Sequence, residues 1–296
     1  MKRQNAAISF LIENGLIRLS GFITIFLFIL IVLFLAIDAI PFLFEYSFPD
    51  FITGLNWYPL SGIYGVLPLI FGSFLITILA TMLAIPLSIG TALYMSEIST
   101  SRFRTFLKVI IEVLASIPSV VFGFFGIIIA GPFLEKYFHL DSGMNAFTAS
   151  LMLAFMSIPT ITSVSEEAMQ AVPKSLKYAS LALGATKLQT MIRVTLPAAN
   201  SGIIAGVMLG IGRAIGETMT VMMVSGGAAN ITANIFDPVR TITGTIASEM
   251  GEVIFGDQHY HALFMLGLIL FIITLGINML SSYVVNRIKN SKRANG

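Results

Sequence analysis

The sequence predicts an all-α membrane protein with six transmembrane helices, on the basis of its composition, its apolar runs and the distribution of its charges. Hydrophobic residues make up 56% of the 296 residues and charged residues only 11%, whereas soluble domains carry about 25% charged residues. The mean hydropathy of +0.90 agrees with this deficit. Such a chain cannot cover its own surface with polar side chains in water, so we expect it to be integral to a membrane.

Six apolar runs are long enough to cross a bilayer, for which roughly 17–25 residues are needed. The first run is too long for the apolar region of a signal peptide, which has about 7–15 residues, and no small-residue cleavage site follows it. We therefore expect it to be retained as a span. The predicted spans cover residues 19–44, 66–95, 109–134, 147–164, 198–224 and 262–285.

The basic residues orient these spans. Fourteen of the 17 lie in the terminal segments or in the loops after the second and fourth spans. Cytoplasmic loops of membrane proteins carry an excess of Lys and Arg, so both termini are predicted to face the cytoplasm. Residues 1–18 and 286–296 then form cytoplasmic ends on either side of a six-span domain of residues 19–285.

The longest cytoplasmic segment, residues 165–197, is predicted to be helical. Within it, Leu176, Ala179, Leu183 and Leu188 recur at a spacing that places apolar side chains on one face of a helix. An amphipathic segment on the cytoplasmic side indicates a contact with another protein or with the membrane surface.

Several function classes are disfavoured by what the sequence lacks. The chain has no cysteine, which excludes disulfides, thiolate metal sites and cysteine nucleophiles. Its three histidines fall in external loops without a third ligand at helical spacing, so we predict no metal site. Because GxxxxGK[ST] and GxSxG motifs are absent, we expect no ATP site and no enzyme activity in this chain. A net charge of +2 gives no reason to expect nucleic acid as a partner.

The fifth predicted span contains five glycines at a recurring spacing of four residues. Small residues four apart on a helix form a groove that a second helix can approach closely. We therefore predict that these glycines serve helix packing. They are Gly202, Gly206, Gly210, Gly212 and Gly216.

The same span contains two charged residues, Arg213 and Glu217. A charge at the centre of a membrane costs at least about 2.5–3.5 kcal/mol, and arginine keeps its proton, so Arg213 must face a partner, a wet cavity or a ligand. One interpretation is a structural ion pair with Glu217, four residues further on. The other is a substrate pathway for a tetrahedral oxyanion, because a guanidinium group donates to two oxygens at once. Thr218 and Thr220 would then supply hydroxyl donors.

The stretch YASLALGATKLQTMIRVTLP resembles the E-A-A-x3-G-x9-I-x-L-P loop of ABC-importer permeases. Gly184 falls on the glycine of that motif and is followed by Ala185. Val194 takes the place of the isoleucine, and Leu196 and Pro197 form the closing pair.

The sequence departs from this motif at its start, where Tyr178, Ala179 and Ser180 stand in place of Glu-Ala-Ala. This departure puts a glutamate contact in doubt but leaves the spacing intact. The resemblance implies that residues 165–197 form a short helix pair that docks in a groove of an ATPase subunit and couples ATP hydrolysis to the spans.

Three further stretches look like the phosphate-specific transport permeases. They read WYPLSGIYGVLPLIFGSF, EVLASIPSVVFGFFG and GIGRAIGETMTVMMVSGG. The first of them, placed before the second span, is more similar to PstC-type subunits than to their PstA-type partners. The resemblance implies a MetI-like, type I ABC importer permease fold, N-in and C-in, in the cytoplasmic membrane of a prokaryote.

The same resemblance implies a substrate and a set of partners. The substrate would be inorganic phosphate, and the partners a PstA-like sister permease, two cytoplasmic PstB-like ATPase subunits and an external PstS-like phosphate-binding protein. ATP and Mg would be bound by the ATPase subunits, with no cofactor in this chain, which itself contacts membrane lipid. Two alternatives stay open: a permease for sulfate or molybdate, and a self-sufficient channel or secondary transporter.

Overall fold

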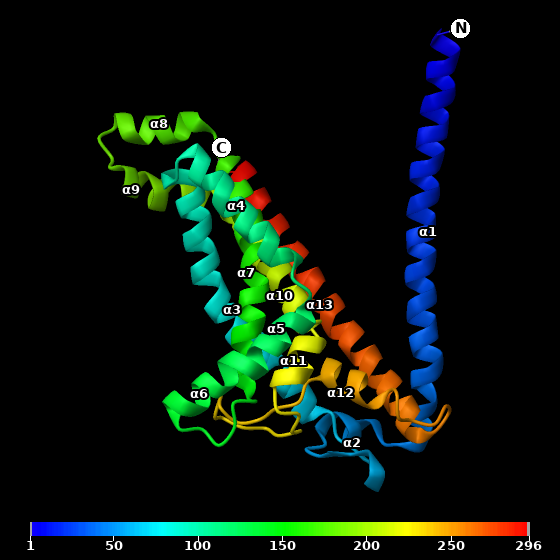
Figure 1. Cartoon of the computed structure of the whole chain (residues 1–296). Helices are drawn as coiled ribbons and strands as arrows, with labels where there is room; N and C mark the ends of the chain where they lie inside the picture. The colour runs from blue at the N-terminus through cyan, green and yellow to red at the C-terminus, as the bar shows by residue number, and fades with distance from the viewer. Residues whose placement is uncertain (1, 295–296) are drawn as a thin grey trace.

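The computed structural model describes the backbone of residues 2–294 and the side chains of residues 15–287. Within this part of the chain, six helical segments are long and apolar enough to cross a membrane. Figure 1 shows them arranged as an elongated bundle, with both chain ends at the same end of the molecule. The six segments are Gly15–Glu45, Leu67–Ile98, Ser119–Phe138, Ala146–Gln170, Lys187–Ile215 and Gln258–Arg287.

The centre of the bundle is α7 (Ala146–Gln170), which packs against α3 (Leu67–Leu93) and α10 (Leu196–Ile215). Its apolar window is 61% buried, the highest share among the six segments. The fourth span is therefore the core around which the others are placed.

The first helix, α1 (Lys2–Glu45), lies at the edge of the bundle and contacts α13 (Gln258–Ala294). Figure 1 shows α1 diverging from α13 toward the end that holds the termini. Only 6% of its apolar window is buried. Because apolar side chains of α1 are exposed along its described length, lipid or another membrane protein must cover them.

Short elements close the opposite end of the bundle. They are α2 (Phe48–Thr53), the antiparallel hairpin of β1 (Trp57–Tyr58) and β2 (Ile63–Tyr64), and α12 (Ile242–Glu249). The hairpin pairs Trp57 with Tyr64 and Tyr58 with Ile63. Both Trp57 and Tyr64 are buried in a cluster that also includes Phe42 of α1 and Phe51 of α2, so this end of the protein has a packed core of its own.

The third span is shorter than predicted. Residues 101–116 form a separate helix, α4 (Ser101–Ser116), and the membrane segment begins only at Ser119 with α5 (Ser119–Phe125). It continues through a π-helical turn, Gly126–Ala130, into α6 (Gly131–Phe138). Proline disfavours helical backbone in the residue before it, and Ile117 is indeed extended ahead of Pro118. The predicted start at residue 109 was therefore wrong.

The fifth span is also interrupted. After α10 ends at Ile215, the chain is irregular over residues 216–218 and continues as α11 (Met219–Val224). The predicted span of residues 198–224 thus consists of two helices. The cytoplasmic segment predicted over residues 165–197 begins later than expected, because residues 165–170 still belong to α7. Its helix pair is α8 (Lys174–Ala182) and α9 (Lys187–Thr190).

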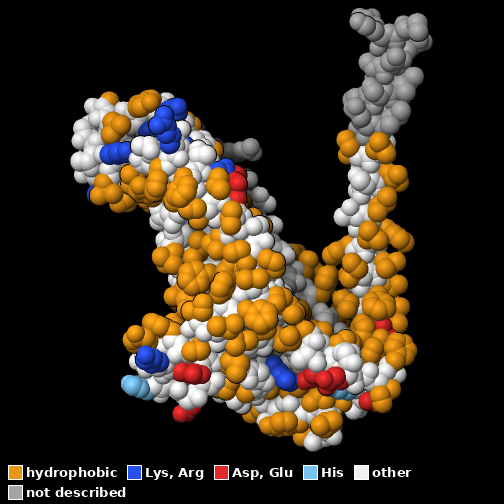
Figure 2. Space-filling model, viewed as in Figure 1, with side chains coloured by type: hydrophobic (Ala, Val, Ile, Leu, Met, Phe, Trp, Pro, Cys, Tyr) orange, Lys and Arg blue, Asp and Glu red, His pale blue; other side chains and the backbone are white. Residues whose placement is uncertain are grey.

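Basic side chains cluster over α8 and α9, whereas most of the acidic side chains visible in Figure 2 lie at the other end of the bundle. This charge distribution places α8 and α9 in the cytoplasm.

In this cysteine-free chain, we expect Asn230→Cys to react with an impermeant thiol reagent added to intact cells. Ser175→Cys, which is on α8, should react only after the membrane is opened. The reverse pattern would overturn the orientation.

Candidate substrate pathway and coupling loop

Arg213 is the only charged residue of α10, and its side chain is exposed in the single chain. One guanidinium nitrogen, Nη1, donates to the Oγ1 of Thr160 on α7 at 3.4 Å. A long hydrogen bond to one neutral hydroxyl leaves most of the five N–H donors of an arginine free. The guanidinium group is therefore available to a ligand or to a neighbouring subunit.

The ion pair between Arg213 and Glu217, one of the two interpretations of these charges, does not form. Residues four apart meet only on a continuous helix, and α10 ends at Ile215. The Glu217 carboxylate instead accepts from the backbone N–H of Thr220 at 3.4 Å. Among the described side chains, the ion-pair contacts join Lys177 to Glu97, and Arg240 and His259 to Glu249.

The break between α10 and α11 lies directly after Arg213. Its backbone is held by side chains, because Thr243 of α12 donates to the carbonyl oxygen of Glu217 at 2.9 Å and Thr218 donates to that of Gly216 at 3.4 Å. Irregular backbone at membrane depth occurs where it is buried in protein or lines a wet cavity. Arg213 thus lies in the last turn of α10, and Glu217 and Thr218 lie in the break that follows it.

Thr220 is placed elsewhere. Its side chain is buried, and the hydroxyl donates to the carbonyl oxygen of Ser119 at 2.8 Å. This bond ties α11 to the start of α5, just after the break at Pro118. The expectation that Thr220 donates to a substrate was wrong for this structure, because its hydroxyl is already engaged inside the bundle.

Three of the five glycines pack α10 against α7. A Cβ atom at Gly206 would lie 3.1 Å from Val164, one at Gly210 would lie 2.6 Å from Ile161, and one at Gly202 would collide with Ala168. By contrast, no atom comes closer than 3.7 Å to a Cβ at Gly212 or Gly216. Gly202, Gly206 and Gly210 therefore permit a close approach of two helices, whereas Gly212 and Gly216 do not serve one in this chain.

Gly184 ends the first helix of the coupling loop, which we define as residues 173–197. Its φ of +85° lies in the left-handed region, which glycine adopts without a steric penalty. The Gly184 N–H bonds to the Leu181 carbonyl oxygen at 3.0 Å, and the Ala185 N–H bonds to that of Ser180 at 3.2 Å. These two bonds form a Schellman motif, which satisfies carbonyl groups at the end of α8.

The second helix of the coupling loop starts at a capping box, in which Thr186 and Gln189 exchange side chain to backbone hydrogen bonds. The two helices are connected by the hydroxyls of Ser180 and Thr190 at 3.0 Å. Val194, Leu196 and Pro197 fall in a π-helical turn, Met191–Thr195, and the first turn of α10. They thus connect the coupling loop to the fifth span.

Several apolar side chains of the coupling loop are exposed. Leu183 is 90% exposed, and Tyr178, Ala179 and Leu188 are also exposed. Leu183, Tyr178 and Ala179 lie outside the segments long enough to cross the membrane, and a group of exposed apolar side chains in such a place is typical of a protein-protein contact. The loop therefore presents a docking surface on the cytoplasmic side.

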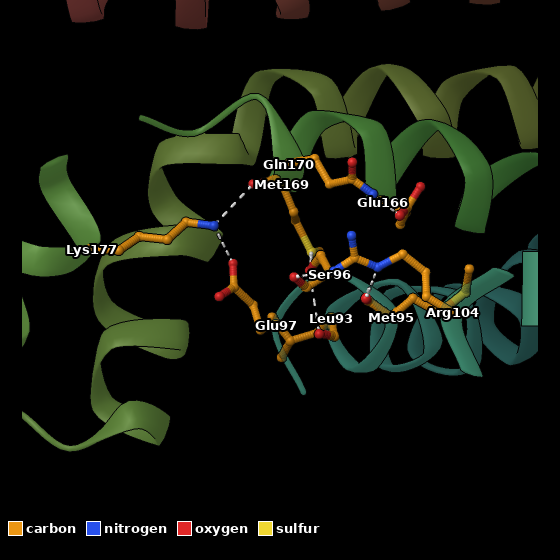
Figure 3. A network of polar contacts seen from close by, with 9 residues as sticks. All are labelled: Leu93, Met95, Ser96, Glu97, Arg104, Glu166, Met169, Gln170 and Lys177. Carbon is orange, nitrogen blue, oxygen red and sulfur yellow. Dashed lines mark hydrogen bonds and ion pairs between the residues drawn. The ribbon is translucent and has the colours of Figure 1, made fainter. Parts of the chain in front are cut away.

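Sequence reasoning missed the contact that connects the coupling loop to the second span. Lys177 of α8 forms an ion pair with Glu97 at 2.5 Å, and Figure 3 shows the two side chains pointing toward one another between their helices. The partners are 80 residues apart in the chain, and no local pattern in the sequence relates them.

At the external end, Glu249 of α12 is a second centre of polar contacts. Its carboxylate accepts from Trp57 Nε1 at 3.0 Å and from Arg240 Nη1 at 2.6 Å, and it contacts His259 Nε2 at 2.9 Å. Beside this cluster, burial raises the pKa of Tyr64, with a further contribution from the charge of Asp257. The phenol therefore stays neutral at physiological pH, and the cluster holds the external hairpin against α12 and α13.

A six-span helical fold with an exposed cytoplasmic helix pair is the architecture expected of a membrane subunit of a transporter. The chain belongs to the family of binding-protein-dependent transport system inner membrane components, whose model matches residues 84–290. It is thus a multi-pass protein of the cytoplasmic membrane. The predicted family and the predicted six-span fold are confirmed.

Individual relatives agree with this assignment. The chain is 39% identical to a probable ABC transporter permease protein, YqgH of Bacillus subtilis, over 81% of this chain and 78% of the relative. It is 35% identical to the phosphate transport system permease protein PstC of Mesorhizobium japonicum, over 81% and 79% of the two chains. The PstC protein of Pasteurella multocida is 34% identical, over 82% and 81%.

Solved structures support the fold. An inward-facing form of the MetNI methionine ABC transporter has a TM-score of 0.60 at 19% identity, and the match covers 79% of this chain and 99% of that one. A bacterial ABC transporter for the polysaccharide alginate has a TM-score of 0.59 at 15% identity, over 82% and 84%. The MetI-like fold is therefore shared with importers of unrelated substrates.

Proposed function

We propose that this chain is the membrane-spanning permease subunit of an ATP-driven importer of inorganic phosphate. The observation that carries the proposal is the exposed guanidinium of Arg213 beside the broken fifth span. The similarity to permeases that are named for phosphate transport supports the choice of anion. A lone cation at this depth is stabilised when an anion or an acidic partner lies opposite it.

In this proposal, Arg213 donates two N–H groups to two phosphate oxygens. The Thr218 hydroxyl exchanges its long, exposed hydrogen bond of 3.4 Å to the Gly216 carbonyl oxygen for one to the anion. Glu217 accepts a hydrogen bond from a protonated phosphate oxygen, because an ionised carboxylate is an acceptor only. Since Arg213 is exposed in the single chain, a sister permease of the PstA type covers this face and completes the pathway.

The partners follow from the two ends of the bundle. Of two PstB-like ATPase subunits, one docks on the exposed apolar residues of the coupling loop and the other on the sister permease. These subunits bind ATP and Mg, for which this chain has no GxxxxGK[ST] motif. At the external end, a PstS-like binding protein delivers phosphate. This chain transports and is not itself an enzyme.

The proposal is tested by uptake of labelled phosphate into proteoliposomes that contain the full complex, with ATP supplied to the ATPase subunits. We expect uptake that requires both ATP hydrolysis and the binding protein, and that an excess of sulfate does not suppress. A non-hydrolysable ATP analogue is the control. Equal uptake of sulfate or molybdate would indicate another oxyanion as substrate, and uptake without ATP would indicate a channel or secondary transporter.

A further inference from the structure

The ion pair between Lys177 and Glu97 connects the coupling loop to the cytoplasmic end of α3. Glu97 lies in a π-helical turn, Tyr94–Ile98, that continues α3. The side chain of Lys177 is 17% exposed and that of Glu97 is 12% exposed. An exposed ion pair contributes little, but the loss of one partner from a shielded pair leaves an uncompensated charge. Removal of one partner from this contact should therefore cost more than removal of one partner from a pair on the open surface.

Several helices meet at this ion pair, as Figure 3 shows. Lys177 Nζ also donates to the carbonyl oxygen of Met169 near the end of α7, at 3.4 Å. The Ser96 hydroxyl lies 3.5 Å from the sulfur of the same methionine. Arg104 of α4 donates from Nε to the Met95 carbonyl oxygen at 2.7 Å and from Nη2 to that of Ser96 at 3.0 Å. The π-helical turn that holds Glu97 is thus fixed to α4, α7 and α8 together.

The attachment of α8 to the bundle is otherwise sparse. No residue of α8 is buried, and its Ser180 contacts Thr190 within the coupling loop itself. The family motif has a glutamate one position after Lys177, where this chain has an exposed tyrosine, Tyr178. The charged contact of α8 is therefore made by Lys177 with the cytoplasmic end of α3.

We propose that the Lys177–Glu97 ion pair is the joint through which a displacement of α8 moves α3. This inference rests on the proposed docking of ATPase subunits on the coupling loop. Since α3 packs against both α7 and α10, its movement changes the helix packing around Thr160 and Arg213. Turns of π-helix occur frequently at functional sites, and one such turn connects α3 to Glu97 while another connects α9 to α10. Lys177 and Glu97 are thus positioning residues for transport.

The first test compares phosphate uptake with ATP hydrolysis in proteoliposomes of the full complex. We expect Glu97→Gln and Lys177→Gln each to raise the number of ATP molecules hydrolysed per phosphate imported by roughly fivefold or more, the lower end of the range for coupling between sites. The exchanged pair, Glu97→Lys with Lys177→Glu, should restore the ratio. Lys108→Gln on α4 and Glu167→Gln on α7 are matched controls, because both residues are exposed and lie outside the coupling loop. Unchanged ratios in the single variants would overturn the proposal.

A second measurement is independent of the transported anion. Spin labels on cysteines at Ser175 of α8 and Leu87 of α3 report the distance between the two helices with and without a bound ATP analogue. We expect this distance to stay constant in the otherwise unaltered complex, since the helices move together, and to change in Glu97→Gln. If the distance between the labels responds to the ATP analogue in the same way in both complexes, the proposal that the ion pair moves α3 with α8 is refuted. If phosphate is not the substrate, uptake fails in every variant, yet the distances still decide whether the ion pair links the helices.

Discussion

Replacement of Gly184 by valine is expected to uncouple ATP hydrolysis from phosphate uptake while the chain stays inserted in the membrane. The structure attributes this effect to the backbone, because nothing lies within 4 Å of a Cβ atom at this position and φ is +85°. A left-handed conformation costs an ordinary L-residue roughly 1–2 kcal/mol, and a β-branched residue is an outlier there. Valine should therefore break the Schellman motif and release the end of α8 from its fixed path into α9.

The measurement for Gly184→Val is the ratio of phosphate imported to ATP hydrolysed in the reconstituted complex. Gly184→Asn is the matched control, because asparagine tolerates left-handed backbone several times more often than other residues, and it should retain most of the coupling. Membrane levels of both variants are compared by immunoblotting to detect misfolding. Equal coupling in Gly184→Val and the unaltered chain would show that the docking surface does not depend on this turn.

The parts of the fold that were predictable are those fixed by local composition. The six spans follow from apolar runs of bilayer length, and the orientation follows from the positions of Lys and Arg. The residues at which helices begin and end were harder to predict from the sequence. Residues 109–116 are apolar enough to extend the third span, yet the extended backbone at Ile117, imposed by Pro118, makes them part of α4. Hydropathy alone cannot separate a surface helix from a span that follows it directly.

The site was predictable only in part, for a similar reason. The charge of Arg213 within an apolar helix singles it out, and the glycine at 184 has the left-handed backbone that a helix-ending glycine requires. The interpretation of Glu217 as an ion-pair partner required helical spacing across residues 216–218, where the helix is broken. The contacts of Lys177 with Glu97 and of Thr220 with Ser119 join residues 80 and 101 positions apart. Such pairs are set by packing of the whole bundle.

Replacement of Arg213 by alanine is expected to abolish phosphate uptake, although ATP hydrolysis by the complex continues. Hydrogen bonds to charged groups contribute about 1.5–3 kcal/mol each, so the loss of a bidentate contact should lower uptake by more than about tenfold, the factor that corresponds to 1.4 kcal/mol. Arg213→Lys is the conservative control. It keeps the charge but not the planar fork, and we expect partial uptake from it. Uptake by Arg213→Ala within twofold of the unaltered complex would remove this residue from the pathway.

Glu217 provides the complementary test of the same pathway. At neutral pH phosphate still carries P–OH groups, which can donate a hydrogen bond to a carboxylate. Sulfate carries no proton at this pH and is repelled by the carboxylate. We therefore expect Glu217→Gln to weaken the preference for phosphate over sulfate at the permease step, in contrast to the general loss in Arg213→Ala. Because the binding protein selects its ligand first, the measurement requires a complex in which that protein is bypassed or exchanged. An unchanged phosphate-to-sulfate ratio would exclude Glu217 from selection of the anion. Since Glu217 does not pair with Arg213 in the single chain, its role would then be the hydrogen bond that its carboxylate accepts from the Thr220 N–H. That bond shapes the break between α10 and α11.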